Sequence, residues 1–241
     1  MDIFILGAGK PKNYNKPIAL KKINHKITVL DWQINLFQKI FKKTNITFLS
    51  KYKYNEIKKN FPYLNIFKIP NKVKSSILNS FLSIPFRNKR TVIFYSDTIF
   101  DKSIFQLKKN IKYDLIVYVD TNFKNRYPKR PKIDLDKAEI LKKNITKLKL
   151  NCEFTGILQL NEKLSLFLKK NKEKINGKNL IDLIKYIKKE KFIVRFIDIK
   201  DKWAEFNYDQ DIARFILGNK AETLERLKLF NNKFKIPKQI Y

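Results

Sequence analysis

Two glycines behind the first apolar segment mark the part of the sequence best suited to chemistry. Gly7 and Gly9 follow the apolar run of residues 3–6, in a chain that has 5 glycines among 241 residues. Glycine lets another group approach the backbone closely, and the main-chain amides of such a turn bind anions. Lysines follow at positions 10, 12 and 16. A strand, a glycine turn and lysines together predict a loop that holds phosphates. The alternative is a plain turn after a strand.

The glycine segment matches neither of the two common phosphate-binding motifs. Residues 7–12 read Gly-Ala-Gly-Lys-Pro-Lys and lack the third glycine of a dinucleotide-binding fingerprint. The sequence contains no Walker-type P-loop either. The segment therefore predicts phosphate binding without identifying the ligand.

Acidic side chains placed just after predicted strands are the candidates for metal binding. Asp97 follows the apolar segment 91–95. Carboxylate oxygens suit Mg²⁺, which also bridges phosphates, although a helix cap or a turn is the alternative role for Asp97. Residues 203–211 contain further acids, and Glu205 or Asn207 is a candidate second ligand. The alternative is that these acids favour the start of a helix through its dipole.

The segment 120–130 combines an acid with two arginines. Asp120 follows a predicted strand, and Arg126 and Arg130 come after it. A guanidinium group binds two phosphate oxygens at once, so the segment predicts a site for a substrate phosphate. The alternative is a basic surface loop. His25 is the only histidine, so zinc sites and histidine-activated nucleophiles are not expected.

The net charge of +31 raises the question of nucleic-acid binding. Most of the 53 basic residues are lysines spread along the chain, together with abundant asparagine and isoleucine. We interpret them as a solvated surface and expect no specific nucleic acid as partner. The single cysteine excludes an internal disulfide, and no apolar run is long enough to cross a bilayer. These features predict a cytoplasmic protein without membrane insertion.

Apolar patterns predict strands that alternate with helices. Such alternation indicates a mostly parallel sheet with a ligand site beyond the carboxyl ends of its strands. Gly7, Asp97 and Asp120 would then converge on one site. Thr28 and Asp31 are expected to cap the first long helix. The expected strands are 1–6, 46–49, 65–69, 91–95, 114–119, 153–160 and 192–198, and the expected helices are 29–41, 55–61, 75–83, 162–175, 180–189 and 221–230.

Several segments occur in an order that resembles bacterial nucleotidylyltransferases, especially the cytidylyltransferase branch that includes phosphocholine cytidylyltransferases. The resemblance covers about residues 1–215, and the shared order of the segments carries it. The segments are FILGAG (4–9), VLDWQI (29–34), SSILNS (75–80), YSDTIF (95–100), DTNFKNR (120–126), KAE (137–139), EFTGI (153–157) and WAEFNYDQD (203–211).

The resemblance implies an α/β fold, a three-layer sandwich with a central, mostly parallel mixed sheet. It implies transfer of CMP from CTP onto a phosphorylated small molecule, with Mg²⁺ as cofactor and release of pyrophosphate. The implied catalytic residues are Asp97, Lys10 and Lys16. The implied nucleotide-binding residues are Leu6, Gly7, Ala8, Gly9, Lys12, Ser75 and Ser76. The implied substrate-binding residues are Asp120, Arg126, Arg130 and Glu153, and the implied metal ligands are Asp97, Glu205 and Asn207.

The sequence departs from the family pattern in the loop and in the closing metal segment. The loop lacks a further glycine and an arginine, and the later Pro-Lys pair is reversed as Lys16-Pro17. Asn207 stands where the family offers an aspartate, so it can ligate Mg²⁺ through its carbonyl oxygen but adds no charge. This departure favours an alternative, a catalytically silent nucleotide-binding module that partners a kinase. A basic RNA-binding protein is a further alternative.

The last part of the chain carries a second resemblance. Residues 218–227 (GNKAETLERL) resemble the opening of phosphoenolpyruvate-synthase-like kinase domains of surface-polysaccharide pathways. The resemblance implies a nucleotidylyltransferase domain over 1–217 and a helical tail over 218–241 that begins a further domain in a longer chain. It also implies a role in decorating a surface polysaccharide or lipid, with a fused or partner kinase that makes the phosphorylated substrate.

Overall fold

A seven-stranded sheet runs through the middle of the protein. The structure is a computed structural model that describes residues 1–11, 15–23, 26–41, 44–105, 112–122, 152–177, 179–200 and 202–206. The strands lie in the order β3-β2-β1-β4-β7-β6-β8. Their bounds are β1 (Asp2–Gly7), β2 (Asn45–Ser50), β3 (Asn65–Lys68), β4 (Thr91–Tyr95), β6 (Leu115–Asp120), β7 (Glu153–Leu160) and β8 (Val194–Asp198).

Within this sheet only β7 runs against the other described strands. β1 is parallel to β2 and β4, β2 to β3, and β6 to β8, whereas β7 is antiparallel to β4 and β6. The carboxyl ends of the six parallel strands therefore lie at one edge, where β7 begins. A separate two-stranded sheet pairs β5 (Thr98–Phe100) with β9 (Trp203–Glu205). The mixed, mostly parallel sheet predicted for this sequence is confirmed.

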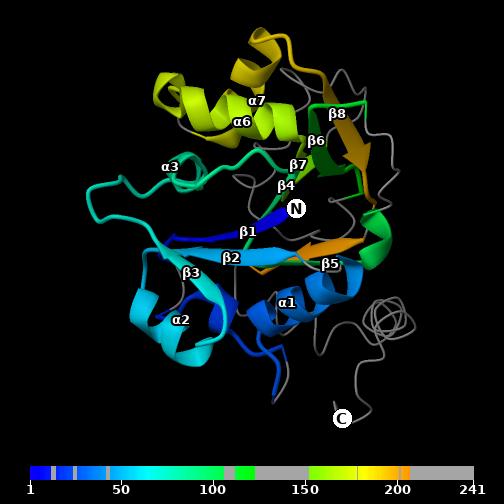
Figure 1. The fold of residues 1–241 in the computed structure, drawn as a ribbon. Coiled ribbons are helices and arrows are strands. Elements are labelled where there is room, and N and C mark those ends of the chain that lie inside the picture. Colours follow the sequence, from blue (N-terminus) through cyan, green and yellow to red (C-terminus); the bar gives the residue numbers. More distant parts are fainter. Residues whose placement is uncertain are drawn as a thin grey trace.

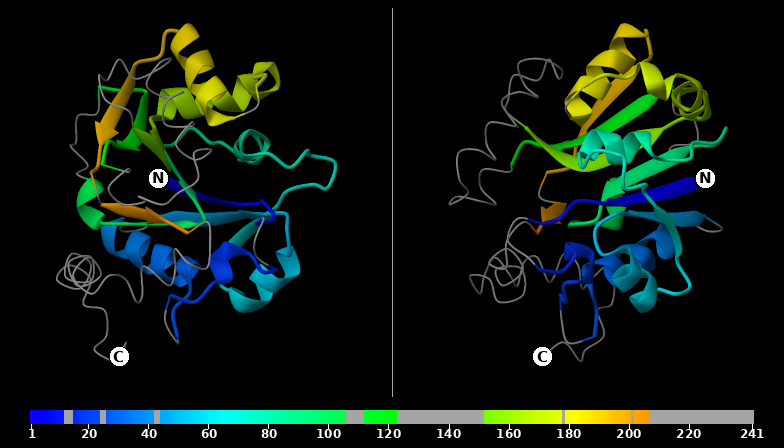
Figure 2. Two further views of the ribbon diagram at one scale, coloured as in Figure 1. Left: turned by 180° about the vertical axis from the view of Figure 1, so that it is seen from behind. Right: turned by 90° about the vertical axis from the view of Figure 1, so that its left-hand side faces the viewer.

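Helices cover both faces of the sheet and give the protein three layers (Figure 1). α1 (Val29–Ile40) and α2 (Tyr54–Asn60) lie on one face. α3 (Ile77–Leu82), α6 (Glu162–Asn171) and α7 (Leu180–Lys189) lie on the other, and Figure 2 shows the same separation from two further sides. The short 3-10 turns are η1 (Ile18–Leu20), η2 (Lys102–Ile104) and η4 (Lys172–Lys174). The predicted α/β three-layer sandwich is confirmed.

Each face of the sheet has its own apolar core. On the α1 side, Phe37 packs against Phe94 of β4 with ring centroids 4.4 Å apart. On the other side, Leu164 of α6 and Ile184 of α7 belong to a core that includes Leu158 of β7. Successive side chains of a strand point to opposite faces, so a strand covered on both sides must be apolar throughout. This explains the continuous apolar runs of β1 and β4.

Helix α1 begins where its capping residues predict. Thr28 Oγ1 accepts a hydrogen bond from the Asp31 amide at 3.1 Å, and Asp31 Oδ2 accepts one from the Thr28 amide at 2.9 Å. This reciprocal pair forms a capping box, which satisfies amide groups that have no partner inside the helix. It therefore fixes the start of α1 at Val29.

The structure differs from the expected elements in a few places. The helix expected over 162–175 ends at Asn171 and continues as η4, and α3 is shorter than the helix expected over 75–83. The strands β5 and β9 were not expected, because three-residue strands are too short to show alternation. The helix expected over 221–230 and the boundary expected at 217 lie outside the described residues. Among the helices that the structure describes, none is long and apolar enough to span a membrane.

Candidate active site

Residues from four strands meet at the carboxyl edge of the sheet. β1 ends at Gly7, β6 ends at Asp120, and Asp97 follows β4 after one residue. Glu153, the first residue of the antiparallel β7, pairs with Asp120. Ligands of such sheets bind beyond the carboxyl ends of the strands. The edge that holds these four residues is therefore the candidate active site.

Asp97 lies in a tight turn between β4 and β5 that is held from several sides. The side-chain amide of Gln33 on α1 donates to the carbonyl of Tyr95 at 2.8 Å and to that of Thr98 at 2.6 Å. Thr98 Oγ1 also donates to the Tyr95 carbonyl, at 3.0 Å. Gln33 is completely buried, so water does not compete for its hydrogen bonds. The backbone that carries Asp97 thus has a fixed position.

The β5–β9 pair brings Glu205 close to Asp97. Glu205 lies opposite Thr98 in this ladder, and the Phe206 amide donates to the Asp97 carbonyl at 2.8 Å. Burial, and then the carboxylates of Asp97 and Glu205, raise the pKa of Tyr95 well above its ordinary value. Both carboxylates therefore lie near enough to raise the pKa of the same tyrosine, although they come from segments about a hundred residues apart.

Two carboxylates in this position fit a magnesium ion that arrives with a nucleotide. Mg²⁺ is usually held by one or two carboxylates together with substrate phosphates. Asp97 and Glu205 are both half-buried at the sheet edge, although Asp97 Oδ1 itself is buried. The described residues contain no group of three or more acids, histidines or cysteines suited to a metal. Within the described part of the chain, the candidate ligands are thus these two acids.

Asp120 is a buried residue that supports the site through its hydrogen bonds. It is completely buried, and its Oδ2 accepts a hydrogen bond from the indole N–H of Trp203 at 2.8 Å. Its Oδ1 accepts one from the Asn122 amide at 2.8 Å. Trp203 begins β9, so Asp120 attaches the strand that carries Glu205 to the end of β6. The structure gives Asp120 a supporting position, and the expected contacts of Asp120 and of the buried Glu153 with substrate stay predictions.

The two glycines of the loop differ in their surroundings. A Cβ on Gly7 would lie 2.0 Å from Cζ of Phe48, so packing against β2 explains this glycine. A Cβ on Gly9 would meet no described atom within 4 Å. Neither glycine is among the described residues with positive φ. Leu6 and Ala8, also expected to contact nucleotide, are buried in the core on the α3 side. Of the two glycines, Gly9 is therefore the one that leaves room for a ligand.

The expected lysine and serine ligands are partly placed. Lys10 and Lys16 are exposed near the end of β1 and before η1. Ser76 is the N-cap of α3, and its hydroxyl accepts a backbone amide of the first helical turn at 3.0 Å. Ser75 Oγ lies 3.4 Å from Lys51 Nζ. The remaining expected residues lie outside the described part of the chain; they are Lys12, Arg126, Arg130 and Asn207.

The sequence did not predict the residues whose hydrogen bonds hold the backbone around the site. Gln33 falls on the apolar face of its helix, and a polar residue there signals a buried hydrogen bond. Lys51 Nζ donates to the carbonyls of Asn71 and Val73, which orders the loop that leads to α3. No sequence pattern signals the Lys51 contacts, because its partners lie at least 20 residues away.

Comparisons with solved structures identify the fold. A candidate glucose-1-phosphate thymidylyltransferase from Bacillus anthracis, in complex with sucrose, matches with a TM-score of 0.66 and 14% identity, over 92% of this chain and 95% of that chain. The inositol-1-phosphate CTP transferase from T. maritima matches with a TM-score of 0.63 and 14% identity, over 94% of this chain and 96% of that chain. No protein-family model and no curated protein matches the sequence. The likeness shows the fold, and this protein has the fold of nucleotidyltransferases.

Proposed function

We propose that this protein transfers a nucleotidyl group from a nucleoside triphosphate to a phosphorylated small molecule and releases pyrophosphate. The observation that carries the proposal is the placement of Asp97 and Glu205 beside the glycine loop, at the carboxyl edge of the sheet. In this fold that edge is where the resemblance places the triphosphate. Both solved neighbours are described as nucleotidyltransferases, which supports the proposed reaction class.

The chain's own residues would act by positioning and by neutralising charge. Main-chain amides of residues 7–9, with Lys10, Lys12 and Lys16, would hold the triphosphate. Asp97, with Glu205 or Asn207, would hold Mg²⁺, which when bound neutralises charge that develops on the phosphates. Arg126 and Arg130 would orient the acceptor phosphate, with Asp120 and Glu153 lining the acceptor side. An oxygen of that phosphate attacks the α-phosphorus, and the bond from the α-phosphorus to the pyrophosphate oxygen breaks.

CTP is the proposed nucleotide, because the sequence segments resemble cytidylyltransferases and one solved neighbour is described as a CTP transferase. The acceptor is a phosphorylated alcohol or sugar, since both neighbours are named for sugar or inositol phosphates. A cytoplasmic location and a role in decorating a surface polysaccharide or lipid belong to the same proposal. So does a kinase, fused or separate, that supplies the phosphorylated acceptor.

The test is pyrophosphate release with Mg²⁺, screening CTP, UTP, ATP and GTP against a panel of phosphorylated small molecules. Release is expected with one nucleotide and one class of acceptor. Asp97→Asn is expected to abolish it, whereas Asp182→Asn, which changes a carboxylate on the distant helix α7, is expected to leave it intact. Wild-type turnover by Asp97→Asn would remove this residue from the mechanism.

A catalytically silent nucleotide-binding module is the second candidate, and Asn207 in place of an acid favours it. It predicts that CTP raises the melting temperature while no nucleotide and acceptor pair releases pyrophosphate. The screen therefore separates the two candidates directly.

A further inference from the structure

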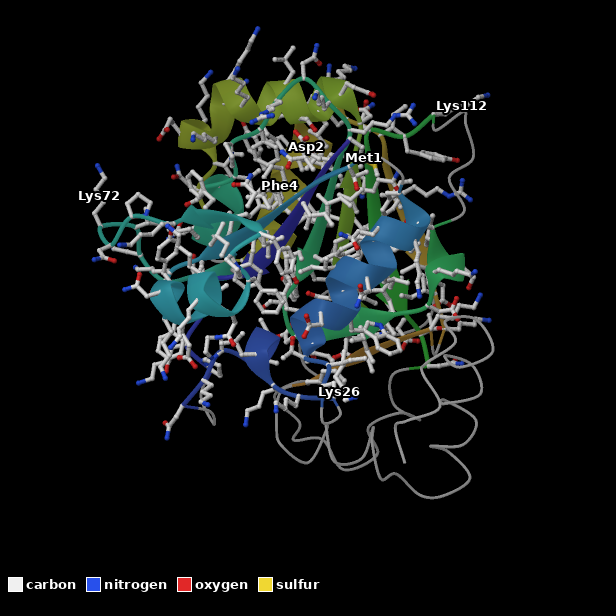
Figure 3. All side chains as sticks on the ribbon, turned by 60° about the horizontal axis from the view of Figure 1, so that its bottom comes forward. Met1, Asp2, Phe4, Lys26, Lys72 and Lys112 are labelled. Atoms are coloured by element: carbon white, nitrogen blue, oxygen red, sulfur yellow. The ribbon has the colours of Figure 1, made fainter. Side chains whose placement is uncertain are left out.

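A hollow lies at the edge of the sheet opposite to the candidate active site. It has a volume of about 270 Å³ and is lined by the first residues of β1, β2 and β3. Asp2 and Phe4, two residues apart on β1 and both labelled in Figure 3, line it together with Thr47 and the exposed Arg87. Gly7 lies at the other end of β1, so this hollow is separate from the proposed nucleotide site.

Several polar side chains lie on the sheet near the hollow, at the beginnings of the strands. In the strand register Asp2 lies beside Asn45, and Thr47 lies beside Asn65. The Asn65 side-chain amide donates to Thr47 Oγ1 at 2.9 Å, so these two side chains form one polar surface. The next row toward the carboxyl edge consists of apolar residues from the same strands. Asn45 and Asn65 are exposed, whereas Asp2 and Thr47 are buried, and a buried polar side chain normally has a hydrogen-bond partner.

The carboxylate of Asp2 is the group in the hollow that most requires a partner. Asp2 is 3% exposed, and its Oδ2 has no hydrogen-bond partner among the described residues. Its own amide donates to the Arg90 carbonyl at 2.9 Å. The hydroxyl of Thr91, its neighbour on β4, bonds to the Lys89 carbonyl at 3.2 Å and to Ser165 Oγ at 3.1 Å. A buried carboxylate without a partner is costly, so a ligand that supplies a donor there is favoured.

Arg87 provides the opposite charge in the same hollow. It lines the hollow with Asp2, yet in the described part of the chain no ion pair within 4.0 Å joins the two side chains. Phe4 and Phe67 provide apolar walls. A molecule with an ammonium group at one end and an anionic group at the other would satisfy both charges, with its methylene groups against the rings.

We propose that this hollow binds a small zwitterion, whose ammonium group donates to the Asp2 carboxylate and whose anionic group accepts from the Arg87 guanidinium. The volume of about 270 Å³ lies just below the range of about 300–1,000 Å³ for pockets that hold drug-sized ligands, so it fits a smaller molecule. The site goes beyond nucleotidyl transfer, and its occupancy does not depend on that reaction.

Isothermal titration calorimetry with amino acids of increasing length tests the proposal, using glycine, β-alanine, 4-aminobutyrate and 6-aminohexanoate as probes. One length is expected to bind. Propylamine and propionate, which each carry one of the two charges, are expected to bind at least about tenfold more weakly. Asp2→Asn and Arg87→Gln are each expected to weaken binding at least about tenfold. Asp182→Asn on α7 and Arg195→Gln on β8 are matched controls and are expected to leave it unchanged.

Two results would overturn the proposal. The first is that no probe binds, and the second is that Arg87→Gln binds as tightly as the unmodified protein. Arg87 is exposed, so this variant keeps its fold even if Asp2→Asn does not. Saturating CTP with Mg²⁺ is expected to leave the affinity unchanged. Competition by the nucleotide would place the zwitterion at the other edge of the sheet and contradict the proposal.

Discussion

Replacing Gln33 with leucine tests whether a buried amide holds the turn that carries Asp97. Gln33 donates to the carbonyls of Tyr95 and Thr98, and the Tyr95 carbonyl keeps a second donor in Thr98 Oγ1. The main loss is therefore the bond to the Thr98 carbonyl. A buried carbonyl that loses its donor costs about 1–3 kcal/mol. Leucine also removes Gln33 Oε1, which is buried and has no partner among the described residues, and this offsets part of the cost.

We therefore expect Gln33→Leu to lower the free energy of unfolding by about 2 kcal/mol. For a chain of this length, 1 kcal/mol corresponds to about 2–4 °C in melting temperature, so the expected decrease is about 4–8 °C. Thermal unfolding followed by circular dichroism measures it. The control is Gln38→Leu, because Gln38 lies on the same helix but is exposed.

Activity should fall more steeply than stability in Gln33→Leu. A shift of about 1 Å in a catalytic group can cost on the order of a hundredfold in rate. Pyrophosphate release measured well below the melting temperature separates this effect from unfolding. Equal melting temperatures and equal rates for Gln33→Leu and Gln38→Leu would refute the idea that Gln33 positions Asp97.

Four further predictions concern the same edge of the sheet. Gly7→Ala is expected to destabilise the protein by about 1–3 kcal/mol, because its methyl group would overlap the buried ring of Phe48, and urea unfolding measures this. Gly9→Ala is expected to unfold like the unmodified protein but to bind CTP more weakly in calorimetry, so equal affinity would argue against a ligand beside Gly9. Trp203→Phe deprives the buried Asp120 carboxylate of its indole donor and is expected to cost about 2 kcal/mol of stability in the same urea assay. Folded Tyr95 keeps its proton where the unfolded phenol loses it, so stability falls as pH rises above about 10, and a Tyr95→Phe variant with an unchanged slope in this range would contradict this.

Much of the fold could be predicted because its determinants are local. The apolar runs of β1 and β4 and the capping box of α1 are visible in short stretches of sequence. The position of Asp97 at a strand end followed from the same patterns. The parallel pairing of β1 with β4, and the antiparallel strand β7 between β4 and β6, place Gly7, Asp97 and Asp120 at one edge of the sheet.

The rest depended on contacts between distant parts of the chain. β5 and β9 stabilise each other only after the chain has folded, and their pairing is what brings Glu205 to Asp97. Gly7 and Gly9 also look equivalent in the sequence. In the structure, the ring of Phe48 leaves no space for a side chain at Gly7, whereas the space beside Gly9 holds no described atom. The burial of Asp2 could not be predicted, because an acid near the start of a strand looks like an ordinary end residue.

The most direct test of the central claim measures metal binding, with Mn²⁺ in place of Mg²⁺, by electron paramagnetic resonance in the presence of CTP. The proposed site requires the carboxylates of Asp97 and Glu205, which lie beside Tyr95 at the carboxyl edge of the sheet. Asp97→Asn and Glu205→Gln are each expected to weaken binding of the Mn²⁺–CTP complex at least about tenfold, and Asp182→Asn is expected to leave it unchanged. Unchanged binding in both Asp97→Asn and Glu205→Gln would contradict a metal–nucleotide site at this edge.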